Sequence, residues 1–397
     1  MADLMAFSPP DPDNQVTLEN WRSPPFNKWA FSNVRNLIPN QNISASNNPV
    51  KFSKNWIDLS EILVEDRRQK ATTLQDFLLK THTDSLVVLR DGALIWSWYG
   101  GYARPNTQHI IFSISKSLTA LIALSLSDDN VLDLDREIGH YISEVKGSAY
   151  ETATCRNLLD MNVSSNFEEN YLDKTGIFHR YRNATGWNPC EPKDRKGLWK
   201  FLPSIVKGSS NHGDFIHYCS PHTDMMGWLI ERVSNINFCE LIHRKVFDPC
   251  GMKFDSYVTL DSFGAPRTAG GINICAVDLA KVGELMRCDG AYNGSQILSP
   301  DSVNDIRSYN NGVSWSSDNF EWAHRSFPSG RYRSNWYQSG QADGEFFGSG
   351  IHGQWLWINP KKRITIVRLA STPNPLSLAD KDNAQAIFTV ITDVLSV

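Results

Sequence analysis

The chain has 397 residues, of which 41% are hydrophobic and 21% are charged, and its formal net charge at pH 7 is -4. This composition is ordinary for a globular protein and unlike that of a disordered chain. The slightly acidic charge balance offers no basic field for a phosphate backbone, so we expect no nucleic-acid partner.

The N-terminal region shows no pattern for export or membrane insertion. No Lys or Arg precedes Arg22, and the longest apolar stretch, residues 118–126, is too short to cross a bilayer. The seven cysteines are scattered without CxxC spacing, which is typical of reduced side chains and not of a disulfide framework or a zinc ribbon. We therefore expect a cytoplasmic protein without membrane contact. A homodimer is compatible with the sequence.

Residues 1–50 are rich in Pro, Asn and Ser and contain "WRSPPFNKWAF", which predicts an irregular arm held by aromatic side chains. The next strong signal, "SLVVLRDGALIWSWYGGY", predicts two strands joined by a turn at Asp91 and Gly92. We expect a sheet to begin with this hairpin.

Helical periodicity dominates residues 113–261, as in "DMMGWLIERVSNINFCELIHRKVF". Strand patterns return after "GGINICAVDLAKVGELM", and "IHGQWLWINPKKRITIVRLAS" predicts a second hairpin. The fold class predicted is α/β (α+β), with a body from residues 1–112 and 262–397 and a mainly helical lobe from residues 113–261 inserted between them. The chain ends in a predicted amphipathic helix whose apolar face holds Ala384, Ile387, Ile391, Val394 and Leu395.

The segment "FSISKSLTALIALS", residues 112–125, combines a serine and a lysine at the start of an apolar helix. Ser113 and Lys116 are three residues apart and therefore share one side of the helix. A serine nucleophile needs an adjacent base, and a lysine can act as one where burial lowers its pKa. The free N–H groups of the first turn also suit an oxyanion. The alternative is that Ser113 caps the helix and Lys116 is solvated.

A second segment, "GDFIHYCSPHTDMMGWLIERV", puts Tyr218 and Ser220 in a loop before a helix. The tyrosine can share a proton with Lys116, and we expect Ser220 to hold that lysine. In the alternative interpretation, the tyrosine packs the loop and the serine caps the helix. A third segment, "FFGSGIHGQWLW", leads from small residues into an apolar strand, where substrate can lie close to the backbone.

These three segments, in this order, resemble the family of class C β-lactamases, D-alanyl-D-alanine peptidases and family VIII esterases, whose pattern is S-x-x-K, Y-x-N or Y-x-S, then K-T-G. Within it the chain resembles the 6-aminohexanoate-dimer (nylon-oligomer) hydrolases, through "NKWAF", "SISKSL", "NLLDMNVSSNFEENYLD", "YCSPHTD", "GGINICAVDLAKVG" and "GIHGQWLW". The resemblance implies a β-lactamase/transpeptidase-like fold, with a central antiparallel sheet flanked by helices.

The resemblance also implies roles for individual residues. Ser113 would be the acylated nucleophile, Lys116 and Tyr218 the acid/base pair, and Ser220 the Y-x-S serine. The backbone N–H groups of Ser113 and Ile351 would form the oxyanion hole.

Other residues of this chain are expected at the substrate. Tyr171 matches the tyrosine of a loop that closes over substrate in the dimer hydrolases. Arg182 and Ala269 stand where their amide-cleaving members are expected to carry Asp and Asn. The third motif reads Gly348-Ser349-Gly350 and lacks the lysine of K-T-G, which argues against lactamase activity. The further residues expected to line the cleft are Trp187, Trp336, Tyr337, Ser349, Gly350 and His352.

Other chemistries have weaker support. The sequence has no G-x-S-x-G elbow, no G-x-x-x-x-G-K-[ST] loop and no H-x-x-x-H pair. The G-x-G-x-x-G match at residues 348–353 leads into a strand and does not open a helix, so it does not predict a dinucleotide site. We interpret His217, His222 and His352 as polar packing and not as metal ligands, in the case of His352 at the cleft. No metal and no cofactor are expected.

The sequence thus predicts a serine hydrolase that forms an acyl-enzyme on Ser113 and cleaves small esters, with linear amides such as 6-aminohexanoate dimer as further candidates. Two alternatives stay open: an acyltransferase that uses an alcohol or amine acceptor, and a binding homologue without turnover.

Overall fold

A computed structural model describes residues 4–65, 70–171, 173–191, 195–308, 312–315 and 321–396. Its helices are α1 (Asn27–Ala30), α2 (Leu74–Lys80), α3 (Ile114–Asp128), α4 (Ile138–Tyr141), α5 (Cys155–Leu159), α6 (Ile177–Ala184), α7 (Leu198–Phe201), α8 (Ser220–Ser234), α9 (Phe238–Ile242), α10 (Ala276–Arg287), α11 (Pro300–Arg307), α12 (Glu321–Ser326) and α13 (Leu378–Leu395). None of the helices in these ranges is both long and apolar enough to span a bilayer.

The strands form one large sheet, one smaller sheet and two short ribbons. The large sheet is antiparallel throughout, in the order β11 (Val313–Ser314), β12 (Arg331–Arg333), β13 (Trp336–Gln338), β14 (Phe346–Gly350), β15 (Gln354–Asn359), β16 (Ile364–Ala370), β4 (Thr83–Arg90), β5 (Ala93–Tyr99). The smaller sheet has the order β1 (Asn40–Ile43), β7 (Ser256–Thr259), β8 (Ile272–Ile274), β6 (His109–Ile110), and the ribbons pair β2 (Leu63–Glu65) with β3 (Ala71–Thr73) and β9 (Ala291–Tyr292) with β10 (Ser295–Gln296).

Both predicted hairpins lie in the large sheet. The β4–β5 turn is made by Asp91 and Gly92, whose φ angles of 52° and 75° are those of a tight hairpin turn. Strands β15 and β16 form the second hairpin. The sheet expected to begin near residue 85 is therefore confirmed.

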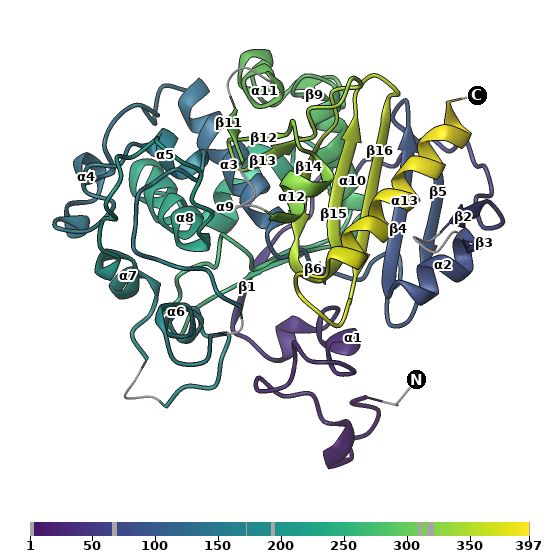
Figure 1. Ribbon diagram of the computed structural model, residues 1–397, viewed down its shortest axis with the longest axis horizontal. Helices are drawn as coiled ribbons and strands as arrows, with labels where there is room; N and C mark the ends of the chain where they lie inside the picture. Colours follow the sequence, from purple (N-terminus) through teal and green to yellow (C-terminus); the bar gives the residue numbers. More distant parts are fainter. Residues whose placement is uncertain are drawn as a thin grey trace.

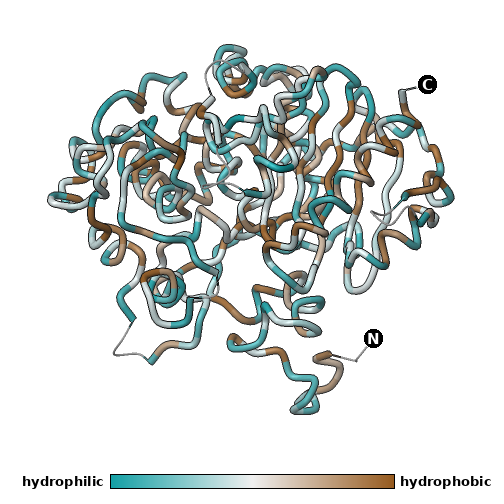
Figure 2. Tube along the Cα trace, viewed as in Figure 1, coloured by the Kyte–Doolittle hydropathy of each residue, from teal (hydrophilic) through white to brown (hydrophobic). Residues whose placement is uncertain are grey.

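Helices cover the large sheet on both faces, as Figure 1 shows for α13 in front of the strands. Alternate residues of β4 enter different cores: Val87 and Leu89 pack with residues of α3 and α10, whereas Leu86 and Val88 pack with residues of α2 and α13. Hydrophobic chain segments accordingly follow the strands of this sheet in Figure 2.

The C-terminal helix differs from the prediction at one position. Ala384, Ile387, Ile391 and Leu395 are buried, but Val394 is 41% exposed. The buried residues are separated by three or four positions and stay on one face, whereas Val394 is one residue, or about 100°, away from that face.

Helices α3 to α9 lie beside the sheets, and α3 is the central one. Its residues from Ile114 to Leu126 are all buried, because it contacts α8, α9 and strands β14 and β15. The N-terminal arm is largely irregular, as expected, and Trp21 anchors it. This buried ring packs against Phe112 and Trp187, next to the start of α3.

Candidate active site

Ser113 immediately precedes α3, and Lys116 lies one turn further on. Lys116 is 1% exposed, and its Nζ donates hydrogen bonds of 2.9 Å to Ser113 Oγ and 2.9 Å to the main-chain oxygen of Ala269. Burial lowers the pKa of Lys116 to about 8. A large fraction of this amine is therefore uncharged slightly above neutral pH and can accept the proton of Ser113.

The Tyr218 hydroxyl hydrogen-bonds with the side chains of Ser113 and Tyr337. Its ring centre lies 4.9 Å from the amine of Lys116. Burial raises the pKa of Tyr218 well above its usual range, so this phenol keeps its proton at neutral pH. The three groups thus provide a candidate nucleophile, a candidate base and a candidate acid close to one another.

Ser220 is placed beside these groups but does not hold Lys116 as expected. Its hydroxyl donates a 2.9 Å bond to Glu169 Oε1, and its N–H donates a 2.5 Å bond to Glu169 Oε2. Ser220 is the first residue of α8, where backbone N–H groups lack partners within the helix and attract a carboxylate. At the start of this helix, Ser220 therefore binds Glu169 and not Lys116.

Glu169 is a site residue that the sequence did not predict. Besides its bonds to Ser220, this carboxylate accepts a 2.5 Å hydrogen bond from the Tyr171 hydroxyl, and its charge acts to raise the pKa of Lys116. Glu169 lines the space around Ser113. It lies in the segment "NLLDMNVSSNFEENYLD", whose resemblance assigned no role to this glutamate, so only the folded chain identifies it.

Strand β14 ends directly against the start of α3. A Cβ atom at Gly350 would lie 2.7 Å from the Ile111 carbonyl oxygen and 3.1 Å from the Ser113 nitrogen, so this approach requires glycine. Phe112, just before Ser113, has a φ of 43°, which is uncommon for a residue with a side chain and typical of functional sites. The backbone at Gly350 and Ile351 thereby lies next to that of Ser113.

A lysine reaches the third motif from the C-terminal helix. Lys381, in α13, is buried, and its amine donates a 2.8 Å hydrogen bond to the Ser349 hydroxyl. Burial lowers its pKa to about 7. The chain lacks a lysine within the motif itself, but the folded protein places one beside Ser349.

Two cavities meet at Ser113, Glu169, Tyr171 and Ile351, which line both. The larger has a volume of about 430 Å³, and its walls include Tyr218, Tyr337, Ser349, Gly350 and Lys381. The narrower has a volume of about 30 Å³, and its walls include Arg182, Trp187, Ser220 and Ala269.

Trp336 and His352 were predicted to line the cleft, and both predictions are wrong. Trp336 is 0% exposed and packs against Phe346, because it points to the opposite face of β13 from Tyr337. His352 is buried beside Phe112, with Nδ1 2.7 Å from the Thr372 oxygen, so it supports the turn after Ile351.

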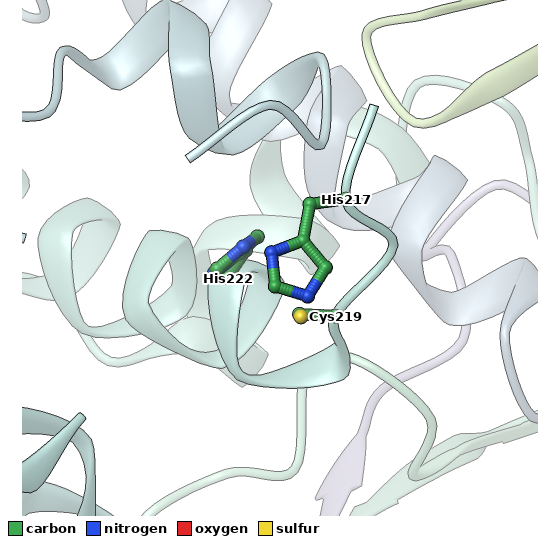
Figure 3. Close-up of side chains that lie close together, drawn as sticks. All are labelled: His217, Cys219 and His222. Carbon is green, nitrogen blue, oxygen red and sulfur yellow. The ribbon is translucent and has the colours of Figure 1, made fainter. Parts of the chain in front are cut away.

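His217, Cys219 and His222 lie close together at the start of α8 (Figure 3), with their candidate ligand atoms within 4.8 Å of one another. His217 Nε2 is 2.8 Å and Cys219 Sγ 3.6 Å from the Phe167 oxygen, and His222 Nδ1 is 3.2 Å from the Tyr150 hydroxyl. Because these protein bonds engage all three side chains, we interpret the cluster as polar packing that fixes the segment around Tyr218.

Comparison with known proteins identifies the family of this chain. The chain is 29% identical to the 6-aminohexanoate-dimer hydrolase of Paenarthrobacter ureafaciens over 91% of its own length and 89% of that protein. A Bacillus anthracis structure with a provisional designation as a 6-aminohexanoate-dimer hydrolase superposes with a TM-score of 0.85, at 23% identity and 97% coverage of both chains. EstCE1, described as a hydrolase with promiscuous acyltransferase activity, gives a TM-score of 0.63 at 14% identity, covering 80% of this chain and 96% of that one. The beta-lactamase family model matches residues 73–390, and the chain therefore belongs to the beta-lactamase family.

Proposed function

We propose that this member of the beta-lactamase family is a serine hydrolase that forms an acyl-enzyme on Ser113 and cleaves small esters. The observation that carries the proposal is the 2.9 Å hydrogen bond from the buried amine of Lys116 to Ser113 Oγ. A buried lysine with a lowered pKa, in contact with a serine at the mouth of a cleft, fits the requirements of nucleophilic catalysis.

In the proposed reaction, Lys116 takes the proton of Ser113 while the serine oxygen attacks the ester carbonyl. The backbone N–H groups of Ser113 and Ile351 stabilise the oxyanion. Tyr218 gives its proton to the leaving oxygen and regains one from Lys116. Water then attacks the acyl group, the same pair removes its proton, and the acid product and free Ser113 result.

Esters are the favoured substrates because an alkoxide leaves more readily than an amine. The name of the Paenarthrobacter relative indicates that the substrate of that protein is a linear amide. Arg182 lines the narrow cavity in this chain, and its charge opposes a substrate with a cationic end. We therefore place short esters before 6-aminohexanoate dimer.

A fluorophosphonate probe with intact-mass analysis tests the proposal. The wild type should gain one label and lose activity, whereas Ser113→Ala should show neither labelling nor turnover. Ser115→Ala is the matched control. This buried serine two residues away accepts a 3.2 Å bond from the Ile272 N–H and lines neither cavity, so its variant should still be labelled. Stoichiometric labelling of a serine in Ser113→Ala would show that the nucleophile lies elsewhere.

Addition of an alcohol during ester turnover tests the acyltransferase alternative. If water is the acceptor, the acid should remain the main product. An ester of the added alcohol as main product would identify a transferase.

A further inference from the structure

Three arginines from separate parts of the chain converge on the narrow cavity beside Ser113. Arg22 comes from the N-terminal arm, Arg182 from α6, and Arg267 from the segment before β8. They share this cavity with the nucleophile, so their charges act on whatever substrate group enters it.

The charge of Arg267 is neutralised by a carboxylate that does not line the cavity. Its Nη1 donates a 2.5 Å bond to the Asp224 carboxylate, which also accepts a 2.5 Å bond from the Tyr181 hydroxyl. Its Nε is buried and has no hydrogen-bond partner. This ion pair fixes the guanidinium at the cavity wall and leaves one donor unused.

Arg22 and Arg182 form no such ion pair with a described residue, although the charges of Glu169 and Asp173 act on Arg182. Arg22 stacks on Trp21 at 5.0 Å and donates a 2.5 Å bond to Asn188 Oδ1, while its Nη1 is buried without a partner. Arg182 donates a 3.2 Å bond to the Tyr171 oxygen. Neither forms an ion pair with any residue in the described ranges. Burial, together with the charge of Arg182, lowers the pKa of Arg22 to about 9.

Among the residues that the structure describes, Glu169 provides the one carboxylate lining this cavity, and its oxygens already accept bonds from Ser220 and Tyr171. Three guanidinium groups thus face one carboxylate, with Asp224 behind Arg267. An excess of positive charge remains, and the unused donors belong to Arg22 and Arg267, two residues of the cavity wall. Because Arg22 and Arg182 are half-buried and Arg267 is buried, water screens their charges less than at an open surface, and the cavity favours an anion.

The free volume of about 30 Å³ is small. A buried water needs roughly 10 to 15 Å³ by this measure, so the cavity has room for about two oxygen atoms and not for an acyl chain. A carboxylate has two oxygens in one plane, which is the geometry that guanidinium groups bind best.

We propose that this cavity binds a carboxylate of the substrate, so that the preferred substrates are short esters that also carry a carboxylate. The inference rests on the proposed ester hydrolysis at Ser113. Arg22 and Arg182 are its specificity-determining residues.

Two pairs of esters test the inference, one for each half of the substrate. Mono(4-nitrophenyl) glutarate is compared with 4-nitrophenyl valerate, and 4-carboxyphenyl butyrate with 4-carbamoylphenyl butyrate. Ser113→Ala provides the blank for spontaneous cleavage. In at least one of the two pairs, the wild type should hydrolyse the carboxylated ester with a kcat/KM at least about tenfold higher than that for the neutral ester. A charge-assisted contact contributes at least that factor.

Arg22→Gln and Arg182→Gln should each lower this carboxylated-to-neutral ratio at least about fivefold. The ratio of the two kcat/KM values cancels any loss of activity that is common to both esters. Circular dichroism checks that each variant is folded. Arg35→Gln is the matched control and should keep the ratio, because Arg35 lies in the same arm and stacks on Tyr257 at 4.4 Å without lining either cavity.

The outcomes separate the two proposals. Turnover of neutral esters without preference for a carboxylate in either pair overturns the anion site and leaves the hydrolase standing. A preference that survives both arginine substitutions also overturns it. Failure to hydrolyse any of the four esters contradicts the hydrolase itself, and the anion site falls with it.

Discussion

The amine of Lys381 donates a 2.8 Å hydrogen bond to the Ser349 hydroxyl and joins the C-terminal helix to the end of β14. The same amine lies 4.1 Å from the ring centre of Trp322, in the wall of the larger cavity. Two buried lysines therefore act at the cleft, Lys381 in its wall and Lys116 behind Ser113, and burial lowers their pKa values to about 7 and about 8. Because these two pKa values are close, an experiment must show which lysine controls the pH dependence of turnover.

For a neutral ester, kcat/KM should rise with pH around a midpoint near 8. Below that pH the Lys116 amine is charged and cannot accept the Ser113 proton, whereas above it the amine is neutral and can, which follows from its pKa of about 8. A pH profile of kcat/KM checks this.

Lys381→Met distinguishes the two lysines. The midpoint should stay near 8 in this variant, whatever the change in maximal rate, because Lys116 is unaltered. A midpoint that disappears or shifts by more than about one unit would assign the titration to Lys381 instead.

Tyr218→Phe should lower kcat by roughly 10² to 10⁴, the usual contribution of general acid/base catalysis, because it removes the hydroxyl that contacts Ser113. Steady-state kinetics on folded protein measure the effect. Tyr332→Phe is the matched control: this tyrosine is also buried, its ring centre is 6.2 Å from that of Tyr218, and it lines neither cavity. An equal loss in both variants would point to packing and not to proton transfer.

Treatment with EDTA should leave ester turnover unchanged. The residues His217, Cys219 and His222 use ring nitrogens and the thiol in hydrogen bonds within the protein, and the proposed reaction needs no metal. The measurement is activity before and after chelation, followed by addition of zinc. Activity lost to EDTA and restored by zinc would show that this cluster holds a functional ion.

Short-chain nitrophenyl esters should react at least about tenfold faster in kcat/KM than 6-aminohexanoate dimer, a barrier difference of about 1.4 kcal/mol or more. The positive charge of Arg182 in the narrow cavity disfavours the ammonium end of the dimer, and the amine is the poorer leaving group. Arg182→Asp combined with Ala269→Asn should shift the ratio toward the amide. Comparable values for ester and dimer in the wild type would make nylon-oligomer hydrolysis the better description.

Local sequence patterns account for the parts of this protein that depend on neighbours in the chain. Ser113 and Lys116 are three residues apart on one helix, so their contact follows from helix geometry. The two hairpins follow from alternating strands and tight turns, which are equally local.

Long-range packing determines which distant groups complete the cleft. No sequence pattern assigns a role to Glu169 or Lys381, and the burial that lowers the pKa of Lys381 exists only after α13 has packed on the sheet. Arg22 and Arg267 are far apart in sequence and reach one cavity because the N-terminal arm folds back against the start of α3. The sequence predicted that both Trp336 and Tyr337 line the cleft. The orientation of β13 in the sheet determines that Tyr337 faces the cleft and Trp336 does not. Such contacts depend on long-range packing, which a pattern of neighbouring residues does not specify.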